Sequence, residues 1–287
     1  MVKEELVKAV VENKNQIDVL KNIGKVSKII LSIDCFSNEE IKKYVREIKN
    51  KKKKVGVRLE RISRYEEIKT LREETDEIIN LEGVDEILVE NLDQYAYLLR
   101  RIRYLKNINI ELDYTMNIYN KVAREVYDEL LLNAIKNNTE DNANKKNYYV
   151  APVELNKFEL KKLTFDTIVV YGFLPTMVSS NCIRKNTYEA NCKNRFNNKN
   201  VETNNSYIID RQNKRINYKT YCKYCYNKIF NAYPIYLLDL DEIRNLNKNI
   251  DLRFDFTIET EKEIEDIIIN NIKPKEFTRG HFINTIK

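Results

Sequence analysis

The sequence alternates short runs of strand-forming residues with helical segments over most of its length. Residues 28–34 and 54–60 are rich in Ile, Leu and Val, as buried strands are. A helix-start signal follows each run. Ser37 can cap the first helix, and Glu40 can reach back to complete a capping box; residues 63–66 repeat this arrangement. Because strands separated by helices need crossover connections, the pattern predicts parallel strands.

Further strands and helices continue the alternation. Strands are expected at residues 86–90, 108–113, 148–153, 167–171 and 251–256, with an eighth near 235–238. Helices are expected at residues 92–105, 118–136, 156–163 and 259–271. The arrangement predicts an α/β fold of the (β/α)8 TIM-barrel type, as a single domain over residues 1–287. A doubly wound open sheet is the alternative.

Hydropathy and charge bear on where the protein works. The mean hydropathy is −0.58, and 33% of the 287 residues are charged. No apolar run approaches the roughly 18 residues that a membrane helix needs. The first residues, Met-Val-Lys-Glu-Glu-Leu, contain no apolar signal core. We therefore expect a cytoplasmic protein that does not cross a membrane.

The alternation stops after residue 171. Residues 182–228 are polar, rich in Asn and Tyr, and contain four of the five cysteines. We interpret this cysteine-rich segment as an insertion after the sixth strand. Within it, residues 207–218 are expected to form a hairpin that turns near Asn213. The remaining cysteine, Cys35, is expected in the core at the end of the first strand.

The four cysteines of this segment form a candidate metal site. In a reducing compartment, clustered cysteines bind metal more often than they form disulfides. Cys222 and Cys225 are spaced so that two thiolates can face one ion or cluster, and Cys182 and Cys192 can complete a shell of four sulfurs. The expected cofactor is a four-iron iron–sulfur cluster. Zinc is the alternative, since thiolates bind both, and a set of unconnected or redox-active thiols is the third interpretation.

The positive charge of the chain is concentrated in the same segment. Residues 182–228 contain 11 basic and 3 acidic residues, whereas the net charge of the whole chain is +6. Tyrosines are interleaved with the cations, and this combination suits single-stranded or loop RNA. The residues expected to contact RNA are Arg184, Lys185, Lys193, Arg195, Arg211, Lys214 and Arg215. The alternatives are a solvated loop and cations that offset the charge of a thiolate-bound cluster.

Acidic residues stand where the expected strands end. In a parallel barrel these ends share the face that carries the active site, where paired carboxylates can perform acid–base chemistry. Capping of the next helix is their alternative role. Arg58 and Arg253 lie inside expected strands, so each requires an anion. The strand-end residues are Asp34, Glu60, Glu90, Asp113, Glu154 and Asp255. The catalytic candidates are Asp113, Asp255, Arg58, Arg253 and the only histidine, His281.

Several segments resemble one known family. Residues 171–182, Tyr-Gly-Phe-Leu-Pro-Thr-Met-Val-Ser-Ser-Asn-Cys, are similar to the Tyr-Gly-Arg-Leu-Pro-Leu-Met-x-Ser-x-x-Cys motif of the collagenase-like peptidases of unknown catalytic type, peptidase "U" family 32. Further similar segments are residues 207–211, 225–239, 253–257 and 278–282. The resemblance spans about residues 166–281 and is to the C-terminal barrel of longer members.

The resemblance implies a barrel-like fold in which four cysteines hold an iron–sulfur cluster. Better-understood members resemble oxygen-independent hydroxylation systems that act on ribosomal or transfer RNA, with prephenate as the implied oxygen source, or on ubiquinone precursors. This sequence has Phe173 in place of the usual Arg, lacks a second cysteine near Cys192, and offers Cys222 as the fourth ligand. The front half of longer members has no counterpart, which implies a partner subunit, a separate half or a degenerate paralogue.

Three functions follow from these observations. The first is an iron–sulfur enzyme that hydroxylates RNA, or its partner subunit beside a paralogous chain. The second is a collagenase-like peptidase, which would depend on His281 because the sequence has neither a Gly-x-Ser-x-Gly elbow nor a His-Glu-x-x-His helix. The third is a non-catalytic, zinc-stapled module for RNA binding or assembly.

Overall fold

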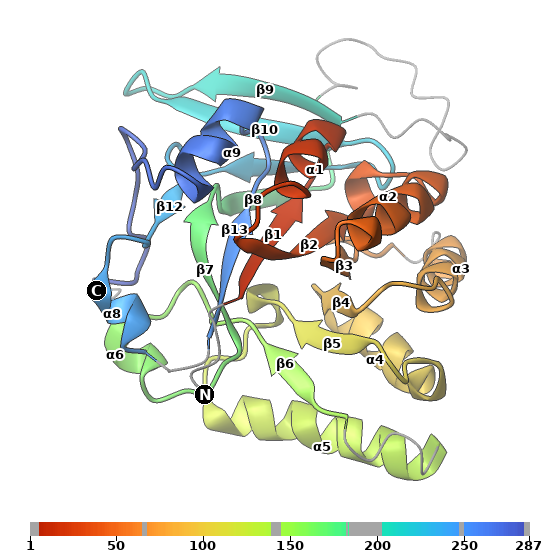
Figure 1. The fold of residues 1–287 in the computed structure, drawn as a ribbon. Coiled ribbons are helices and arrows are strands. Elements are labelled where there is room, and N and C mark those ends of the chain that lie inside the picture. Colours follow the sequence, from red (N-terminus) through yellow and green to blue (C-terminus); the bar gives the residue numbers. More distant parts are fainter. Residues whose placement is uncertain are drawn as a thin grey trace.

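A computed structural model describes residues 6–64, 68–138, 145–181, 183, 203–246 and 250–283. Its main element is a curled sheet with the strand order β12-β7-β13-β1-β2-β3-β4-β5-β6, parallel except for β12 (Figure 1). The strands are β1 Val7–Val11, β2 Val26–Ser32, β3 Lys54–Arg58, β4 Glu86–Val89, β5 Asn109–Leu112, β6 Asn147–Tyr149, β7 Thr167–Gly172, β12 Ile235–Tyr236 and β13 Asp251–Asp255.

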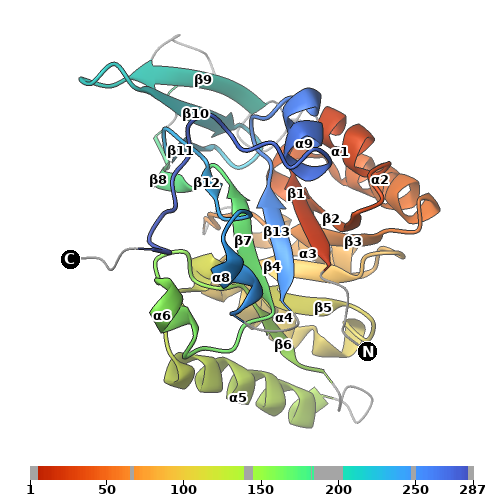
Figure 2. The ribbon, with the colours of Figure 1, turned by 60° about the vertical axis from the view of Figure 1, so that its left-hand side comes forward.

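The curl brings β6 and β7 together, although they stand far apart in the strand order. A parallel bridge joins Val150 to Thr167, and the N–H of Ala151 donates to the Thr167 carbonyl at 2.8 Å. Helices cover the outer face of the curl (Figures 1 and 2). The expected α/β class, with mainly parallel strands and intervening helices, is therefore confirmed, and its sheet is curled.

The helices begin where the sequence supplies caps. Ser37 and Glu40 form the expected capping box at the start of α2, and the Ser37 N–H donates to Glu40 Oε2 at 2.8 Å. Residues 65–67, which overlap the other expected helix start, lie outside the described residues. The helices are α1 Lys14–Leu20, α2 Asn38–Asn50, α3 Ile68–Ile79, α4 Leu92–Arg100, α5 Lys121–Asn138, α6 Lys157–Leu160, α8 Asp241–Arg244 and α9 Glu261–Ile268.

The N-terminal strand β1 was not expected from the sequence. It pairs in parallel with β2 on one side and with β13 on the other. The expectation of an eighth parallel strand near residues 235–238 was wrong, because these residues contain only the two-residue β12, which pairs antiparallel with β7. β1 was missed because Lys8, a residue type rarely buried in a strand, interrupts its apolar residues.

A second sheet is antiparallel and lies across the carboxyl ends of the parallel strands (Figures 1 and 2). Its order is β8-β11-β10-β9, with β8 Pro175–Ser179, β9 Thr203–Ile209, β10 Arg215–Tyr221 and β11 Tyr226–Phe230. β9 and β10 form the hairpin expected from the sequence, and Asn213 in its turn has a left-handed φ of 59°. The sheet therefore begins directly after β7 and includes the described part of the cysteine-rich segment.

Gly172 permits close contact between the ends of β7 and β13. Its φ is +147°, and a Cβ atom at this position would lie 2.7 Å from the backbone oxygen of Asp255. Only glycine tolerates both conditions. Gly172 is therefore required by the structure, because it allows Asp255 of the neighbouring strand to approach the end of β7.

The inside of the curl is polar, whereas the layer between sheet and helices is apolar. Side chains alternate along a strand. On β1 the apolar Ala9 and Val11 alternate with Lys8 and Val10, and Glu12, directly after β1, continues the side of Lys8; all five are buried. Among the described residues, no helix combines the length and the apolar character that a membrane crossing needs. The functional groups considered below lie on the polar side of the sheet.

Candidate functional site

Most of the strand-end carboxylates predicted from the sequence gather at the carboxyl ends of the parallel strands. Glu154, which follows β6, is only half-buried. The others are buried, and they are Asp34, Glu60, Glu90, Asp113 and Asp255. The second sheet covers this end (Figure 2). This region is the candidate site.

Arg253 joins two of these carboxylates inside the curl. Its guanidinium contacts Asp113 at 2.7 and 3.2 Å and Asp255 at 2.6 and 2.8 Å, so both pairs are bidentate. The Arg253 side chain is fully buried. The expectation that this arginine must find an anion is confirmed, and its anions are the two predicted aspartates. The two aspartates engage four of its five N–H hydrogens, which gives Arg253 a positioning role.

Glu12, directly after β1, is the centre of a second charge network at this end. Its carboxylate accepts hydrogen bonds from Arg58 Nη2 at 2.5 Å, from Lys219 Nζ at 2.8 Å and from the Tyr221 hydroxyl at 2.8 Å. Burial opposes ionisation, but the cations of Lys219 and Arg58 more than offset it and lower the pKa of Glu12 to about 2. Sequence reasoning missed Glu12 together with β1; the available signal was an acidic residue after a Val-rich run.

A cavity of about 20 Å³ lies beside this network, with room for about one water molecule. Arg58, Glu90 and Lys228 line it, and the rings of Phe173 and Phe230 complete its wall. Glu90 Oε2 and Arg58 Nε are buried and have no hydrogen-bond partner among the described residues. Phe173 therefore lies at the cavity.

Three carboxyl groups at this end resist ionisation. Burial raises the pKa of Asp34 and of Glu90, because the charged form loses its hydration. Burial also raises the pKa of Glu60, to about 8. Lys228 Nζ lies 4.0 Å from Asp34 Oδ2 and partly offsets the effect there. A carboxyl group whose pKa lies near neutral pH, as at Glu60, is suited to general acid or base chemistry.

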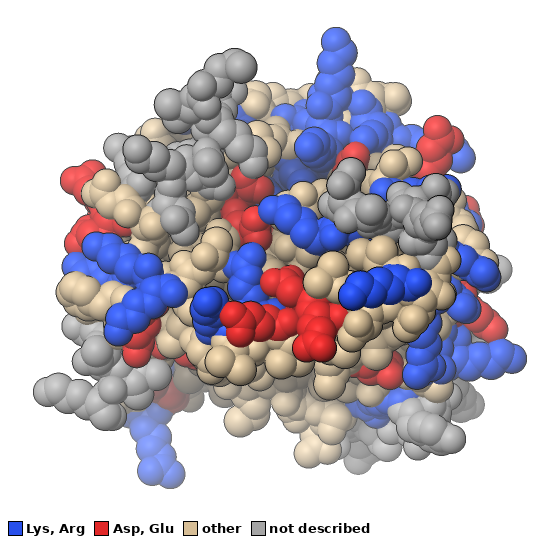
Figure 3. Space-filling model, turned by 90° about the horizontal axis from the view of Figure 1, so that it is seen from below, with Lys and Arg blue, Asp and Glu red and all other residues tan. Residues whose placement is uncertain are grey.

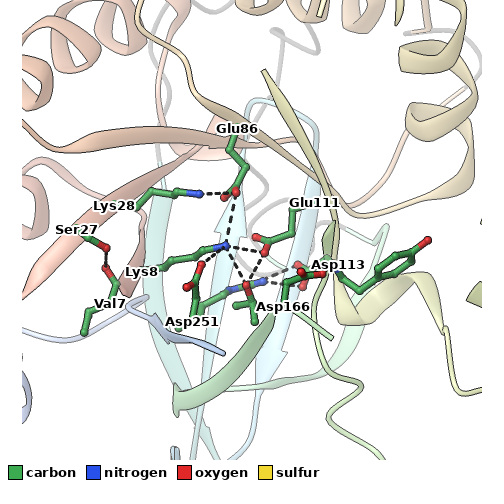
Figure 4. Close-up of polar contacts among 12 residues, drawn as sticks. Val7, Lys8, Ser27, Lys28, Glu86, Glu111, Asp113, Asp166 and Asp251 are labelled. Atoms are coloured by element: carbon green, nitrogen blue, oxygen red, sulfur yellow. Dashed lines mark hydrogen bonds and ion pairs between the residues drawn. The ribbon is translucent and has the colours of Figure 1, made fainter. Parts of the chain in front are cut away.

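The amino end of the same curl contains a network of the opposite sign, centred on Lys8 (Figure 4). Lys8 Nζ lies 2.7 Å from Glu111 Oε1, 3.2 Å from Asp251 Oδ2 and 3.5 Å from Glu86 Oε2. Burial lowers the pKa of Lys8, but these carboxylates more than offset it and raise the pKa well above its usual value. Lys8 is therefore charged and paired throughout the physiological range.

The outer surface of the amino end carries both signs of charge. Figure 3 shows acidic side chains near the middle of this face, with basic side chains around them. Lys28 pairs with Glu86 just inside, and Lys146 Nζ lies 3.4 Å from Asp166 Oδ1 at the surface. These contacts tie strand starts together, so we assign this end to stability rather than to chemistry.

Two of the four metal-ligand candidates lie in the described structure. Cys222 and Cys225 stand on the turn between β10 and β11, and both are half-buried. Cys225 has a left-handed φ of 55°. Cys182 and Cys192 lie outside the described residues. Within the described ranges, no group of three or more His, Cys, Asp or Glu side chains has the geometry of a metal site.

The basic residues of the cysteine-rich segment divide into two groups. Lys219 and Lys228 are buried, where they face Glu12 and Asp34. Near the hairpin tip, the Arg215 guanidinium lies 4.1 Å from the centre of the Tyr207 ring. The exposed RNA-contact candidates are Arg211, Lys214 and Arg215. The others, Arg184, Lys185, Lys193 and Arg195, lie outside the described residues. Part of the local positive charge thus serves as internal counter-ions.

His281 is not brought to the site. It is exposed, and its neighbour Phe282 accepts a backbone hydrogen bond from the Lys157 N–H at the start of α6. It does not line the cavity beside Glu12. A larger hollow of about 550 Å³ lies between α1 and α9 and contains none of the strand-end groups.

Comparison with known proteins shows only weak likeness. No protein-family model matches this sequence, and no curated protein matches it. An uncharacterized B. cereus protein of known crystal structure is 13% identical, with a TM-score of 0.34 over 61% of this chain and 50% of that one. A xylose isomerase-like TIM barrel/4-hydroxyphenylpyruvate dioxygenase fusion protein is 10% identical, with a TM-score of 0.28 over 60% of this chain and 32% of that one. This chain thus matches half or less of either protein, and neither likeness bears on function.

Proposed function

We propose that the chain is an iron–sulfur protein that takes part in the hydroxylation of transfer or ribosomal RNA in the cytoplasm, as the enzyme or as the partner subunit of a paralogous chain. The β10–β11 hairpin is the observation that carries the proposal. Its turn carries Cys222 and Cys225, and its strands supply Lys219 and Lys228 to the buried charges at the strand ends. One hairpin therefore joins the thiols to the cavity.

The proposal includes a closed (β/α)8-type barrel with residues 182–228 as an insertion. The parallel strands β1 to β7 and β13, together with the bridge between Val150 and Thr167, support closure. An insertion after β7 would then cap the carboxyl end of the barrel. This is the end at which enzymes of this architecture carry their active sites.

The donor chemistry of the hairpin turn fits the proposed cofactor. Thiolates bind iron–sulfur clusters, and two residues between Cys222 and Cys225 are the usual separation for a pair of ligands. We assign Cys182, Cys192, Cys222 and Cys225 as the ligands. A bound cluster would supply one-electron chemistry, whereas zinc in the same place would be structural.

The groups at the cavity can bind an anion and hold a proton. Arg58 and Lys228 present positive charge to the cavity. Burial raises the pKa of Glu90, and its Oε2 atom has no partner among the described residues, which makes this carboxyl group a candidate for proton transfer. Arg253 keeps Asp113 and Asp255 in place beside them.

The exposed β9–β10 hairpin supports the RNA part of the proposal. Arg211, Lys214 and Arg215 are exposed there, and the neighbouring Tyr207 ring is 48% exposed. An exposed ring beside guanidinium groups can stack on a base while the cations meet phosphates. No comparable observation favours a peptidase, because His281 lies away from the cavity.

Anaerobic purification followed by iron, sulfide and zinc analysis tests the cofactor. We expect a brown protein with about four irons per chain, and we expect Cys225→Ser to lose them. Cys35→Ala removes a buried thiol that is not on the hairpin turn and should keep the colour. One zinc per chain without iron would favour the binding module, and a metal-free protein would refute the proposal.

The RNA part needs its own measurement. Nucleosides from the ribosomal and transfer RNA of cells with and without the chain should be compared by mass spectrometry. A nucleoside heavier by one oxygen should disappear when the chain is absent, or when it carries Cys225→Ser. Identical nucleoside profiles in all cells would exclude RNA hydroxylation.

A further inference from the structure

The turn between the two cysteines is attached to the parallel sheet and its helices by its own side chains. Lys223 Nζ donates to the carbonyls of Ile33 at 3.3 Å and Phe36 at 3.2 Å, which follow β2. The same ammonium lies 3.4 Å from Glu74 Oε1 on α3. Lys223 therefore fixes one side of the turn to two separate elements.

Tyr224, the other residue between the cysteines, reaches the same carboxylate. Its ring is buried, and its hydroxyl donates to Glu74 Oε2. Glu74 thus contacts both residues that separate Cys222 from Cys225. Its neighbour Glu73 points into solvent instead, with a side chain 65% exposed.

Arg64, in the loop after β3, holds the end of the turn through the backbone. Its Nη2 donates to the Cys225 carbonyl at 2.7 Å and lies 3.5 Å from the Ser180 carbonyl, just after β8. Cys225 has a left-handed φ, which a residue other than glycine keeps only where its surroundings hold it. The Arg64 contact acts directly on this strained residue.

We infer that Glu74 and Arg64 are positioning residues of the Cys222–Cys225 turn. They hold the backbone and the intervening side chains so that the two sulfurs are presented at a fixed separation to one metal. Groups that orient metal ligands commonly change metal affinity 10–100-fold when removed. The inference rests on the proposed function, because it concerns the metal that this function requires.

Cobalt(II) titration of the metal-free chain tests the inference, since thiolate-bound cobalt has a charge-transfer absorption that cobalt bound elsewhere lacks. We expect Glu74→Ala and Arg64→Ala each to weaken cobalt binding about 10–100-fold. Glu73→Ala and Arg103→Ala, which alter exposed side chains on α3 and near α4, should bind like the wild type. Circular dichroism and thermal unfolding accompany each titration.

Tyr224→Phe keeps the buried ring and removes only the hydroxyl that contacts Glu74. If Glu74→Ala does not fold, Tyr224→Phe tests the same contact in a folded protein. We expect Tyr224→Phe to weaken cobalt binding several-fold and to shift the absorption band. Unchanged binding in folded Glu74 and Arg64 variants, or in Tyr224→Phe, would overturn the inference and leave the proposed function standing. A wild type without thiolate–cobalt absorption would overturn both.

Discussion

Strand β1 places a buried charge at each end of the curled sheet, and the two charges have opposite sign. Lys8 lies at the amino end among Glu86, Glu111 and Asp251. Glu12 lies at the carboxyl end, where cations surround it. Lys8 on β1 and Glu12 directly after it are four positions apart and lie on the same side of the sheet. The two sites therefore differ mainly in the residues that surround them.

The partners of the two charges come from different parts of the chain. Those of Lys8 belong to β4, β5 and β13, all strands of the parallel sheet. Those of Glu12 include Lys219 and Tyr221 from β10 of the second sheet. The amino end is therefore complete within the parallel sheet, whereas the carboxyl end is complete only when the second sheet is docked. A substitution in β10 of the second sheet should therefore affect the carboxyl end of the curled sheet and leave the amino end unchanged.

Lys8→Met should have the largest effect on stability. It leaves the buried Glu86 and Glu111 and the half-buried Asp251 without their shared cation, and breaking a buried ion pair in this way costs about 3–5 kcal/mol. Urea unfolding measures the loss. Lys43→Met, at an exposed site on α2, is the control and should change the free energy of unfolding by less than about 0.5 kcal/mol. A loss below about 1 kcal/mol for Lys8→Met would contradict the assignment of the amino end to stability.

Glu12→Gln should cost less, about 2–3 kcal/mol at neutral pH, because the amide keeps the shape and still accepts a hydrogen bond. The folded-state pKa of Glu12 is lowered from 4.5 to about 2, so its contribution is complete above pH 4.5 and is lost as the pH falls towards 2. The difference between variant and wild type should therefore shrink over this window. A difference that is independent of pH would show that the Glu12 charge is not what stabilises the carboxyl end.

Glu60→Gln should change how the free energy of unfolding depends on pH, rather than its value at one pH. Burial raises the folded-state pKa of Glu60 from 4.5 to about 8, so the unfolded state releases this proton first. The stability from Glu60 is complete below pH 4.5 and is lost as the pH rises to 8. Removing the Glu60 carboxyl group should make the free energy of unfolding fall less steeply with rising pH, by at most about 1.4 kcal/mol per pH unit. Parallel profiles for variant and wild type would show that Glu60 ionises normally.

The double variant Arg211→Ala/Arg215→Ala should have the smallest effect on stability, within about 0.5 kcal/mol, because both side chains are exposed. The double variant should instead weaken the binding of RNA. Fluorescence anisotropy with single-stranded RNA at several salt concentrations should show weaker binding and a salt slope reduced by about 0.7 per lost phosphate contact. Arg103→Ala is the matched exposed control. An unchanged slope would remove the hairpin tip from the RNA surface.

The sequence predicted those residues of the candidate site whose position follows from a local pattern, such as an acidic residue at the end of a strand. The strand-end aspartates Asp113 and Asp255 and the strand arginine Arg253 were identified from their positions, and they meet in one bidentate cluster. Glu12 was missed because the strand before it was not predicted, since Lys8 interrupts its apolar residues. Lys219 and Lys228 were counted in the positive charge of residues 182–228, but their burial could not be read from charge alone.

The sequence itself determined the alternation of strands and capped helices, the β9–β10 hairpin and the position of an acidic residue at the end of several strands. Each of these depends on residues within a few positions of one another. The pairing of the charges was decided only by the tertiary structure. Lys8 meets Glu111 across 103 positions, and Glu12 meets Tyr221 across 209. Such contacts exist only once the sheet has curled and the second sheet has docked, because a buried charge takes whichever partner the fold brings within reach.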